Sequence, residues 1–350
     1  LAALLLLPRD HLPDWRRMPG LDQAMVRLAL GTILICAGLL AWKLAEFAWS
    51  TDAGLLRWSA SLVMVLCGLA CARPRILAVL ILLVTMVAQG GFQTIEDSWD
   101  GIRSRSYFGI YTVRTFEQAH LRTLTHGSTL HGEQWLEPGL RDVPLTYYGP
   151  TSGAGIVFTA ATGLFGQHAR IGVVGLGTGT LACFARADQD WRFFEIDPLV
   201  ERLSQRGTFT FLRDCAPQAK VTIGDARLEL AKVPAGSIDL LAIDAFSSDS
   251  IPLHLLTDEA LATYLRALSA RGVLLVHISN RFIDLEPVLA AAARKRGLAA
   301  ALREDIPPTD GEYTASVWIV LSRDPARLQA IAASEPEAPW RPLQNPAPAI

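Results

Sequence analysis

The stretch that decides the fold is IGVVGLGTGTLACFARADQDWRFFEID, residues 171–197. It opens with a continuous apolar run, Ile171–Val174, and passes at once into the glycine-rich segment GLGTG, residues 175–179. A second apolar run, Trp191–Phe194, ends at Glu195. A strand, a glycine turn, a helical pattern and a second strand that ends in an acid are typical of a nucleotide-binding unit.

The glycine-rich segment predicts a turn in which a ligand lies against backbone N–H groups. Gly175, Gly177 and Gly179 allow that close approach, and we expect a helix to begin near Thr180. Glu195 lies 20 residues beyond Gly175, where a carboxylate can accept both hydroxyl groups of a ribose. The pattern therefore indicates an adenosine ligand, with NAD as one candidate.

The third strand, Val221–Ile223, runs into Asp225 and Ala226. An Asp side chain and a backbone amide at this edge of the sheet suit the N6 amine and N1 of adenine. Alternatively, Asp225 caps a helix that begins near Arg227. We favour adenine, because Asp225 is the third member of an ordered series with the glycine loop and Glu195.

The fourth strand, Ile238–Ile243, ends at Asp244, and the polar segment AFSSDSIPLHLLT, residues 245–257, follows it. Open α/β sheets bind ligands at the carboxyl ends of their central strands. A carboxylate there can attract a cationic amine and remove its proton, so we predict that Asp244 is the catalytic base. Asp249, in the segment that follows, is either a turn residue or a substrate contact.

The rest of the chain divides by composition into four regions. Apolar strands alternate with helical patterns over residues 151–322, which predicts a parallel sheet covered by helices on both faces. Within it, EPVLAAAARKRGLAAAL, residues 286–302, is interpreted as one sheet-covering helix. Residues 98–150 alternate like short strands and predict a small β-rich domain. Residues 323–350 are rich in Pro and Ala, and we expect a loose tail.

Residues 1–97 form the fourth region, which we predict to be transmembrane. The chain is 51% hydrophobic and only 19% charged, with a mean hydropathy of +0.28, which is too apolar for an ordinary soluble enzyme. Leu28–Trp49, Leu55–Ala72 and Ile76–Phe92 each approach the roughly 20 residues that a bilayer-spanning helix needs. The opening LAALLLL reads as the end of a further apolar helix, so we expect the region to be incomplete at its N-terminus.

Charge and cysteine content exclude two other classes of protein. The net charge of −2 gives no basic field for nucleic acid. The five cysteines form no CxxC pair, and no disulfide framework is predicted. The spacing of His126 and His131 is not that of a pair on one helix face, and no Cys or third His lies nearby, so we predict no metal site.

These motifs, in this order and spacing, resemble the spermidine synthase family of aminopropyltransferases, specifically its bacterial membrane-fused branch. The resemblance covers about residues 103–322, and DAFSSDSIPLHLLT, residues 244–257, is its most specific stretch. It implies a small β domain followed by a Rossmann-like fold of the class I methyltransferase type. It also implies decarboxylated S-adenosylmethionine or S-adenosylmethionine as co-substrate, an amine or polyamine as acceptor, and no metal. A homo-oligomer is compatible with it.

Residue roles follow from the resemblance by position. Glu195 is expected to bind ribose, and Asp225 and Ala226 are expected to bind adenine. Asp244 is expected to act as the base that activates the attacking nitrogen. Residues of the small β domain are expected to line the amine pocket; these are Gln134 and Tyr147 or Tyr148. An enzyme that uses this donor needs its catalytic domain on the cytoplasmic side of the inner membrane, where the donor is made. The arginine-rich loops at residues 8–27 and 72–75 favour the opposite orientation.

The sequence departs from the soluble enzymes at Thr178 and Phe108. Soluble members carry an acid at the position of Thr178, and that acid holds the aminopropyl ammonium. We therefore expect only weak preference for the decarboxylated donor, and a shift towards it on Thr178→Asp. Two other functions stay open: a methyltransferase that acts on an amine or another small nucleophile, and a non-catalytic, ligand-sensing membrane protein.

Overall fold

The structure is a computed structural model that divides into two compact units, Leu1–Arg103 and Ser104–Ile350. Beyond isolated helical positions between 31 and 86, it describes residues 91–127, 129–246, 252–280, 283–308 and 311–344. The predicted apolar spans thus lie almost wholly outside the described residues. Within the part of the chain that is described, no helix combines the length and the apolar character needed to cross a membrane. The first unit includes helix α4, Gly91–Trp99.

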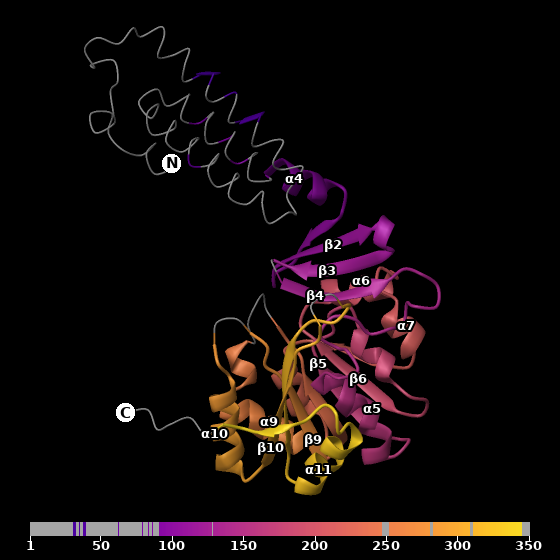
Figure 1. The fold of residues 1–350 in the computed structure, drawn as a ribbon, viewed down its shortest axis with the longest axis vertical. Coiled ribbons are helices and arrows are strands. Elements are labelled where there is room, and N and C mark those ends of the chain that lie inside the picture. The colour runs from indigo at the N-terminus through magenta and orange to yellow at the C-terminus, as the bar shows by residue number, and fades with distance from the viewer. Residues whose placement is uncertain are drawn as a thin grey trace, which may run out of the picture. The chain divides into compact units, whose positions relative to one another are not determined.

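The small β-sheet expected after Trp99 is present. Its four strands follow the chain in order, and β2, β3 and β4 pair antiparallel with Val113 opposite Leu124 and Leu124 opposite Gly132. The strands are β1 Arg103–Arg105, β2 Ile110–Phe116, β3 Leu121–His126 and β4 Thr129–Trp135. In Figure 1, β4 is the strand of this sheet that lies nearest to the large sheet.

The large sheet has eight strands in the order β12-β10-β11-β9-β8-β5-β6-β7. The strands are β5 Arg170–Val174, β6 Asp190–Glu195, β7 Lys220–Ile223, β8 Ile238–Ile243, β9 Leu268–His277, β10 Ala299–Asp305, β11 Ser316–Ser322 and β12 Arg341–Pro342. From β7 to β9 neighbouring strands are parallel. This is the Rossmann-like core that the sequence predicts.

The prediction of a wholly parallel sheet is wrong at one edge. Strand β11 pairs antiparallel with β9 and with β10, and β10 pairs antiparallel with β12. Only residues 306–315 connect β10 to β11, whereas a parallel pair needs a crossover of a dozen or more residues. An apolar strand reads the same in either direction, so its sequence does not reveal how it pairs.

Helices cover both faces of the large sheet (Figure 1). Along β8, Leu240 and Ala242 join the apolar cluster on one face, while Leu241 and Ile243 join the cluster on the other. The first cluster includes residues of α5 Gly153–Phe165, α6 Pro198–Gln205 and α11 Pro325–Ser334. The second includes residues of α8 Ala226–Lys232, α9 Asp258–Ala267 and α10 Glu286–Arg296.

Residues 286–302 do not form the single helix that was expected. Helix α10 ends at Arg296, and Gly297 follows with φ +63° and its N–H bonded to the carbonyl of Ala293. A glycine in this left-handed conformation is the commonest helix stop. The alanines beyond it belong to β10, where Ala300 and Ala301 pair with Leu321 and Val320.

The expectation of a loose tail over residues 323–350 is also wrong for most of that range. Asp324 caps α11 by accepting the N–H of Ala326 at 3.1 Å, and Ile331 is fully buried. Strand β12 then adds to the sheet edge, where Arg341 forms an ion pair with Glu286 at 2.7 Å. Proline and alanine content alone does not separate a disordered tail from a short helix with a capping Asp.

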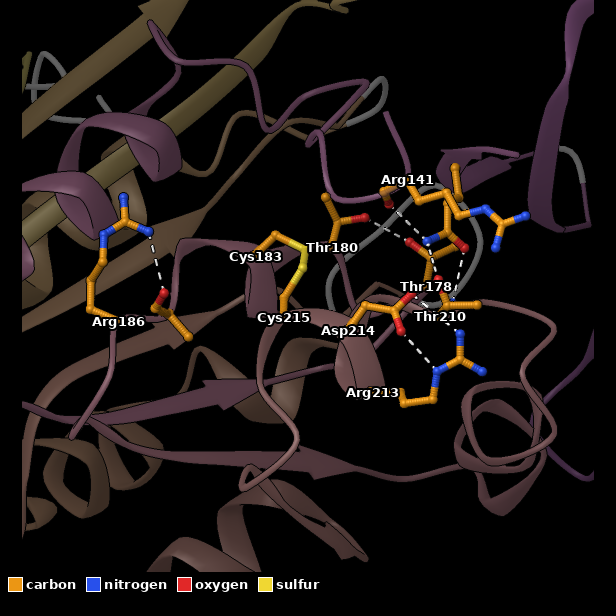
Figure 2. Close-up of a disulfide and its surroundings, with 11 residues drawn as sticks. Arg141, Thr178, Thr180, Cys183, Arg186, Thr210, Arg213, Asp214 and Cys215 are labelled. Carbon is orange, nitrogen blue, oxygen red and sulfur yellow. Dashed lines mark hydrogen bonds and ion pairs between the residues drawn. A yellow bond between two sulfur atoms is a disulfide. The ribbon is translucent and has the colours of Figure 1, made fainter. Parts of the chain in front are cut away.

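A disulfide joins Cys183 to Cys215, 32 residues apart, although the sequence predicts no disulfide framework. Cys183 belongs to the 3₁₀ helix η5, Thr180–Phe184, and Cys215 ends helix α7, Phe211–Cys215. Figure 2 shows the bridge and, to one side of it, the hydrogen-bonded pair Thr178 and Thr180. The bridge therefore anchors the segment that directly follows the glycine loop.

Candidate active site

The site lies at the carboxyl edge of the parallel strands, as their order predicts. The ends of β5, β6 and β8 bring Gly175, Glu195 and Asp244 to the wall of one cavity of about 450 Å³. The small sheet contributes Tyr111 and His131 to the same wall. Other residues lining the cavity are Phe108, His126, Tyr147, Tyr148, Leu176, Gly177, Ile196, Gly224, Ala226, Phe246, Pro252, His254 and Leu255.

The glycine loop passes very close to the strand that carries Asp244. Gly175 has φ +95°, and a Cβ atom placed on it would lie 2.3 Å from the backbone oxygen of Asp244. Gly177 has φ +55° and lies close to the backbone oxygen of His131. Gly179 begins the five-residue helix η5 with φ +90° and is not part of the cavity wall. The loop thus offers close backbone approach rather than the N-terminus of a long helix.

Glu195 is buried at the end of β6 and is hydrogen-bonded to the backbone of the glycine loop. Its Oε2 accepts the N–H of Leu176 at 2.9 Å, and its Oε1 accepts the N–H of Asp197 at 2.8 Å. Burial raises the pKa of this carboxyl group, while the backbone donors oppose that rise. The residue is on the cavity wall, at the strand-end position where nucleotide-binding folds hold a ribose.

We expect Glu195→Gln to weaken binding of an adenosyl ligand by about 1.5–3 kcal/mol, the range for hydrogen bonds to charged groups. The amide nitrogen would also face one of the two backbone donors, which loosens the loop at Leu176. Calorimetry with methylthioadenosine measures the effect. Asp190→Asn, at the exposed opposite end of β6, is the matched control and should leave the dissociation constant unchanged. An unchanged constant for Glu195→Gln as well would remove Glu195 from the binding site.

Asp225 caps helix α8. The sequence analysis gave this capping role as the alternative to adenine binding. Its Oδ1 accepts the N–H groups of Arg227 and Leu228 at 2.9 and 3.2 Å. Its Oδ2 lies 3.3 Å from Nε2 of His254. Asp225 is not on the cavity wall, whereas Ala226 is. Asp225 thus serves as the cap of α8, and its adenine contact stays a prediction, while Ala226 lies on the cavity wall.

Asp244 directly follows β8, and both of its carboxylate oxygens are hydrogen-bonded. Tyr148 donates its hydroxyl to Oδ2 at 2.6 Å, and Nδ1 of His277 lies 2.7 Å from Oδ1. Burial and the nearby charge of Asp244 raise the pKa of Tyr148 far above its ordinary value, so this hydroxyl stays a donor. The result is a buried, oriented carboxylate at the cavity wall.

Only some of the predicted amine-pocket residues lie on the cavity wall. Tyr147 and Tyr148 both lie on the cavity wall. Gln134 does not: its amide donates to the carbonyl of Arg141 and to the hydroxyl of Thr210, and its oxygen accepts the N–H of Thr210. Gln134 therefore ties β4 to the start of α7 and has a structural role. Asp249 lies outside the described residues.

Thr178 does not face the cavity, contrary to the prediction that it contacts the ligand. It is 1% exposed, and its Oγ1 lies 2.8 Å from Oγ1 of Thr180. On its other side is Gly132 of β4, where a Cβ atom would lie 2.3 Å from the same oxygen. The sequence does not reveal this packing, because it depends on how the small sheet meets the glycine loop.

We consequently expect Thr178→Asp to lower stability rather than to change donor selectivity. A carboxylate would be placed between β4 and Thr180, with a cost of about 1–3 kcal/mol for a buried group that is incompletely satisfied. Urea unfolding measures this cost, with Thr178→Ser as the conservative control. A shift in competition between the two donors, with stability unchanged, would restore the original prediction.

His277 is a further residue of the site, and the sequence motifs do not single it out. It ends β9, and its imidazole bonds Asp244. The sequence places a histidine at the end of the strand after the one that carries Asp244, but strand order alone does not show that the two side chains pair. His126 and His131 were considered only as metal ligands. Across the described residues, no cluster of three or more metal-ligating side chains is found.

No protein-family model matches the chain. A curated relative, the polyamine aminopropyltransferase of Vibrio vulnificus (strain CMCP6), is 32% identical over 120 residues, which are 32% of this chain and 38% of that protein. The chain thus aligns with well under half of that relative's length.

A solved structure shares the fold of this chain. A probable spermidine synthase from Corynebacterium glutamicum superposes with a TM-score of 0.54 at 16% identity, covering 71% of this chain and 96% of the other. Spermidine synthase from Thermotoga maritima gives 0.47 at 13% identity, covering 70% and 79%. The comparisons thus show a stretch of sequence similarity to a polyamine aminopropyltransferase and a fold shared with a probable spermidine synthase.

Proposed function

We propose that the chain is a transferase that moves an aminopropyl group from decarboxylated S-adenosylmethionine to an amine or polyamine. The observation that carries the proposal is Asp244: a buried carboxylate, oriented by Tyr148 and His277, beside the glycine loop in the cavity that also contains Glu195. A relative named polyamine aminopropyltransferase supports the same chemistry.

Groups on the cavity wall suit an adenosyl sulfonium. Gly175 and Gly177 present backbone without side chains, and Glu195 presents a carboxylate for ribose hydroxyls. Ala226 and Leu255 supply apolar wall for a flat base. When bound, the sulfonium supplies an electrophilic carbon.

In the proposed reaction Asp244 accepts a proton from the acceptor nitrogen as that nitrogen attacks the carbon beside the sulfur. The new C–N bond forms while the C–S bond breaks, and methylthioadenosine leaves. Tyr148 and His277 hold the carboxylate still, so that orientation as well as basicity contributes to the rate.

Methyl transfer from S-adenosylmethionine is the second candidate, because the glycine loop, residues 175–179, carries no acidic side chain for an aminopropyl ammonium. Incubation of the protein with putrescine and each donor in turn separates the candidates. Methylthioadenosine as product supports aminopropyl transfer, and S-adenosylhomocysteine supports methyl transfer. Failure of both donors would instead support a ligand-sensing role.

We propose further that apolar segments before residue 93 anchor the chain in a bacterial inner membrane, with the catalytic unit on the cytoplasmic side. The composition of this region supports anchoring, as do its described apolar side chains: Ile35, Leu39 and Met86 are 65%, 63% and 56% exposed. Carbonate extraction of membranes tests the anchor. Release of the intact chain into the soluble fraction would overturn it.

A further inference from the structure

His277 is placed beside Asp244 by the register of the sheet. Strands β8 and β9 are parallel with Ile243 opposite Val276, so the next residue of each strand, Asp244 and His277, fall side by side. The two side chains are 6% and 4% exposed, and 2.7 Å separates Nδ1 from the carboxylate. A buried pair this close constrains both partners.

The imidazole ring is packed among three aromatic side chains. It stacks on Trp318, with ring centres 4.2 Å apart and planes 7° from parallel. Tyr147 and Phe246 pack against it at 5.1 and 4.7 Å. Trp318 is also the residue that β11 pairs with His277. The ring therefore cannot turn away from Asp244 without repacking this aromatic cluster.

Asp244 and Ser279 together set the tautomer of His277. An ionised carboxylate only accepts hydrogen bonds, so Nδ1, which lies 2.7 Å from Oδ1 of Asp244, carries the ring proton and donates it. In the neutral ring Nε2 is then the acceptor, and Oγ of Ser279 lies 2.8 Å from it. This Oγ accepts the N–H of Val317 at 2.8 Å and donates its own O–H to Nε2.

We propose that His277 is a positioning residue for Asp244. Its Nδ1–H, fixed by Ser279 and the aromatic stack, holds one oxygen of the carboxylate and so fixes the orientation of Asp244 at the cavity wall. The inference rests on the proposed role of Asp244 as the base. His277 and Ser279 thus fix the orientation of the Asp244 carboxylate, which Tyr148 alone does not do.

Two substitutions separate positioning from simple packing. His277→Asn retains an N–H close to the position of Nδ1 but loses the ring, while His277→Phe retains a ring but loses both nitrogens. If His277 positions Asp244, His277→Phe should lower kcat by about 10- to 150-fold, the size of a lost hydrogen bond to a charged group. His277→Asn should retain clearly more activity, and KM for the donor should stay within about threefold in both. The reverse order of activity would show that the ring serves only as packing.

A double-mutant cycle tests whether His277 acts through Asp244. Because a positioning residue has nothing to position once the base is gone, His277→Phe should have almost no further effect on kcat in an Asp244→Asn background. Equal factors in both backgrounds would overturn the proposal. Should His277→Phe fail to fold, Ser279→Ala probes the same series, with an expected several-fold loss in kcat at unchanged KM.

A readout that needs no activity separates this proposal from the proposed function. In ¹⁵N-histidine spectra of the full chain, His277 should show a protonated Nδ1 and an unprotonated Nε2, and the Nδ1 proton should move on Asp244→Asn. The signal is assigned by its loss in His277→Asn. If this signature is present but the protein turns over neither donor, the proposed function is overturned and the positioning role is not. An Nε2-protonated tautomer would overturn the positioning role even in an active enzyme.

Discussion

Asp244→Asn is expected to lower turnover by about 10²- to 10⁴-fold, the usual contribution of a positioned general base. Asparagine keeps the size of the side chain but removes the proton acceptor and the negative charge. Its amide nitrogen would also face either the hydroxyl of Tyr148 or Nδ1 of His277, both of which donate to Asp244. Steady-state rates with saturating donor and acceptor measure the loss.

Donor binding should survive this change, because the proposed contacts to the adenosyl group come from Glu195 and the glycine loop and do not include the Asp244 carboxylate. We expect the dissociation constant for methylthioadenosine to change by no more than a few-fold. Asp239→Asn is the matched control, since Asp239 lies near the opposite end of β8 and pairs with Arg170. Its turnover should equal that of the wild type. An Asp244→Asn enzyme with a tenth or more of the wild-type rate would exclude Asp244 as the base.

Loss of the Cys183–Cys215 bridge is expected to lower the free energy of unfolding by about 2–4 kcal/mol. The bridge closes a loop between residues 32 apart, and cross-linking restricts the unfolded chain more strongly as that loop lengthens. Urea unfolding of the Cys183→Ser, Cys215→Ser double variant measures the change. Donor affinity should fall with it, because η5 is anchored directly after Gly179.

Each single serine variant should lose as much stability as the double variant, because either substitution breaks the same bond. The wild type in reductant should then unfold at the urea midpoint of the double variant. Identical midpoints for oxidised and reduced wild type would mean that the bridge carries no stability.

The sequence predicted the parts of the site that depend on strand order. Gly175, Glu195 and Asp244 end neighbouring parallel strands, and such ends meet at one edge of a sheet whatever the side-chain packing. The apolar character of those strands and the positive φ demanded of the glycines are local properties. For this reason they could be read from the chain one segment at a time.

The sequence could not predict which way a polar side chain turns. Thr178 faces β4 and Gln134 faces α7 because the small sheet packs on the glycine loop, which is a contact between segments far apart in the chain. Asp225 suits both a helix cap and an adenine contact, and its sequence position does not separate the two roles; in the structure its Oδ1 accepts the N–H groups of Arg227 and Leu228. His277 was missed for the same reason, since its partner lies on another strand.

The disulfide bears on the cellular compartment in which the proposed transferase can act. Paired cysteines persist in oxidising compartments and are rare where thioredoxin and glutathione keep thiols reduced. Trapping cellular thiols with acid and alkylating them reports whether Cys183 and Cys215 are joined in the living cell. Joined cysteines would place the catalytic unit on the side favoured by the arginine-rich loops, away from donor synthesis, whereas free thiols would place it beside that synthesis. The redox state of these two cysteines thus reports whether the proposed transferase can reach the donor where it is made.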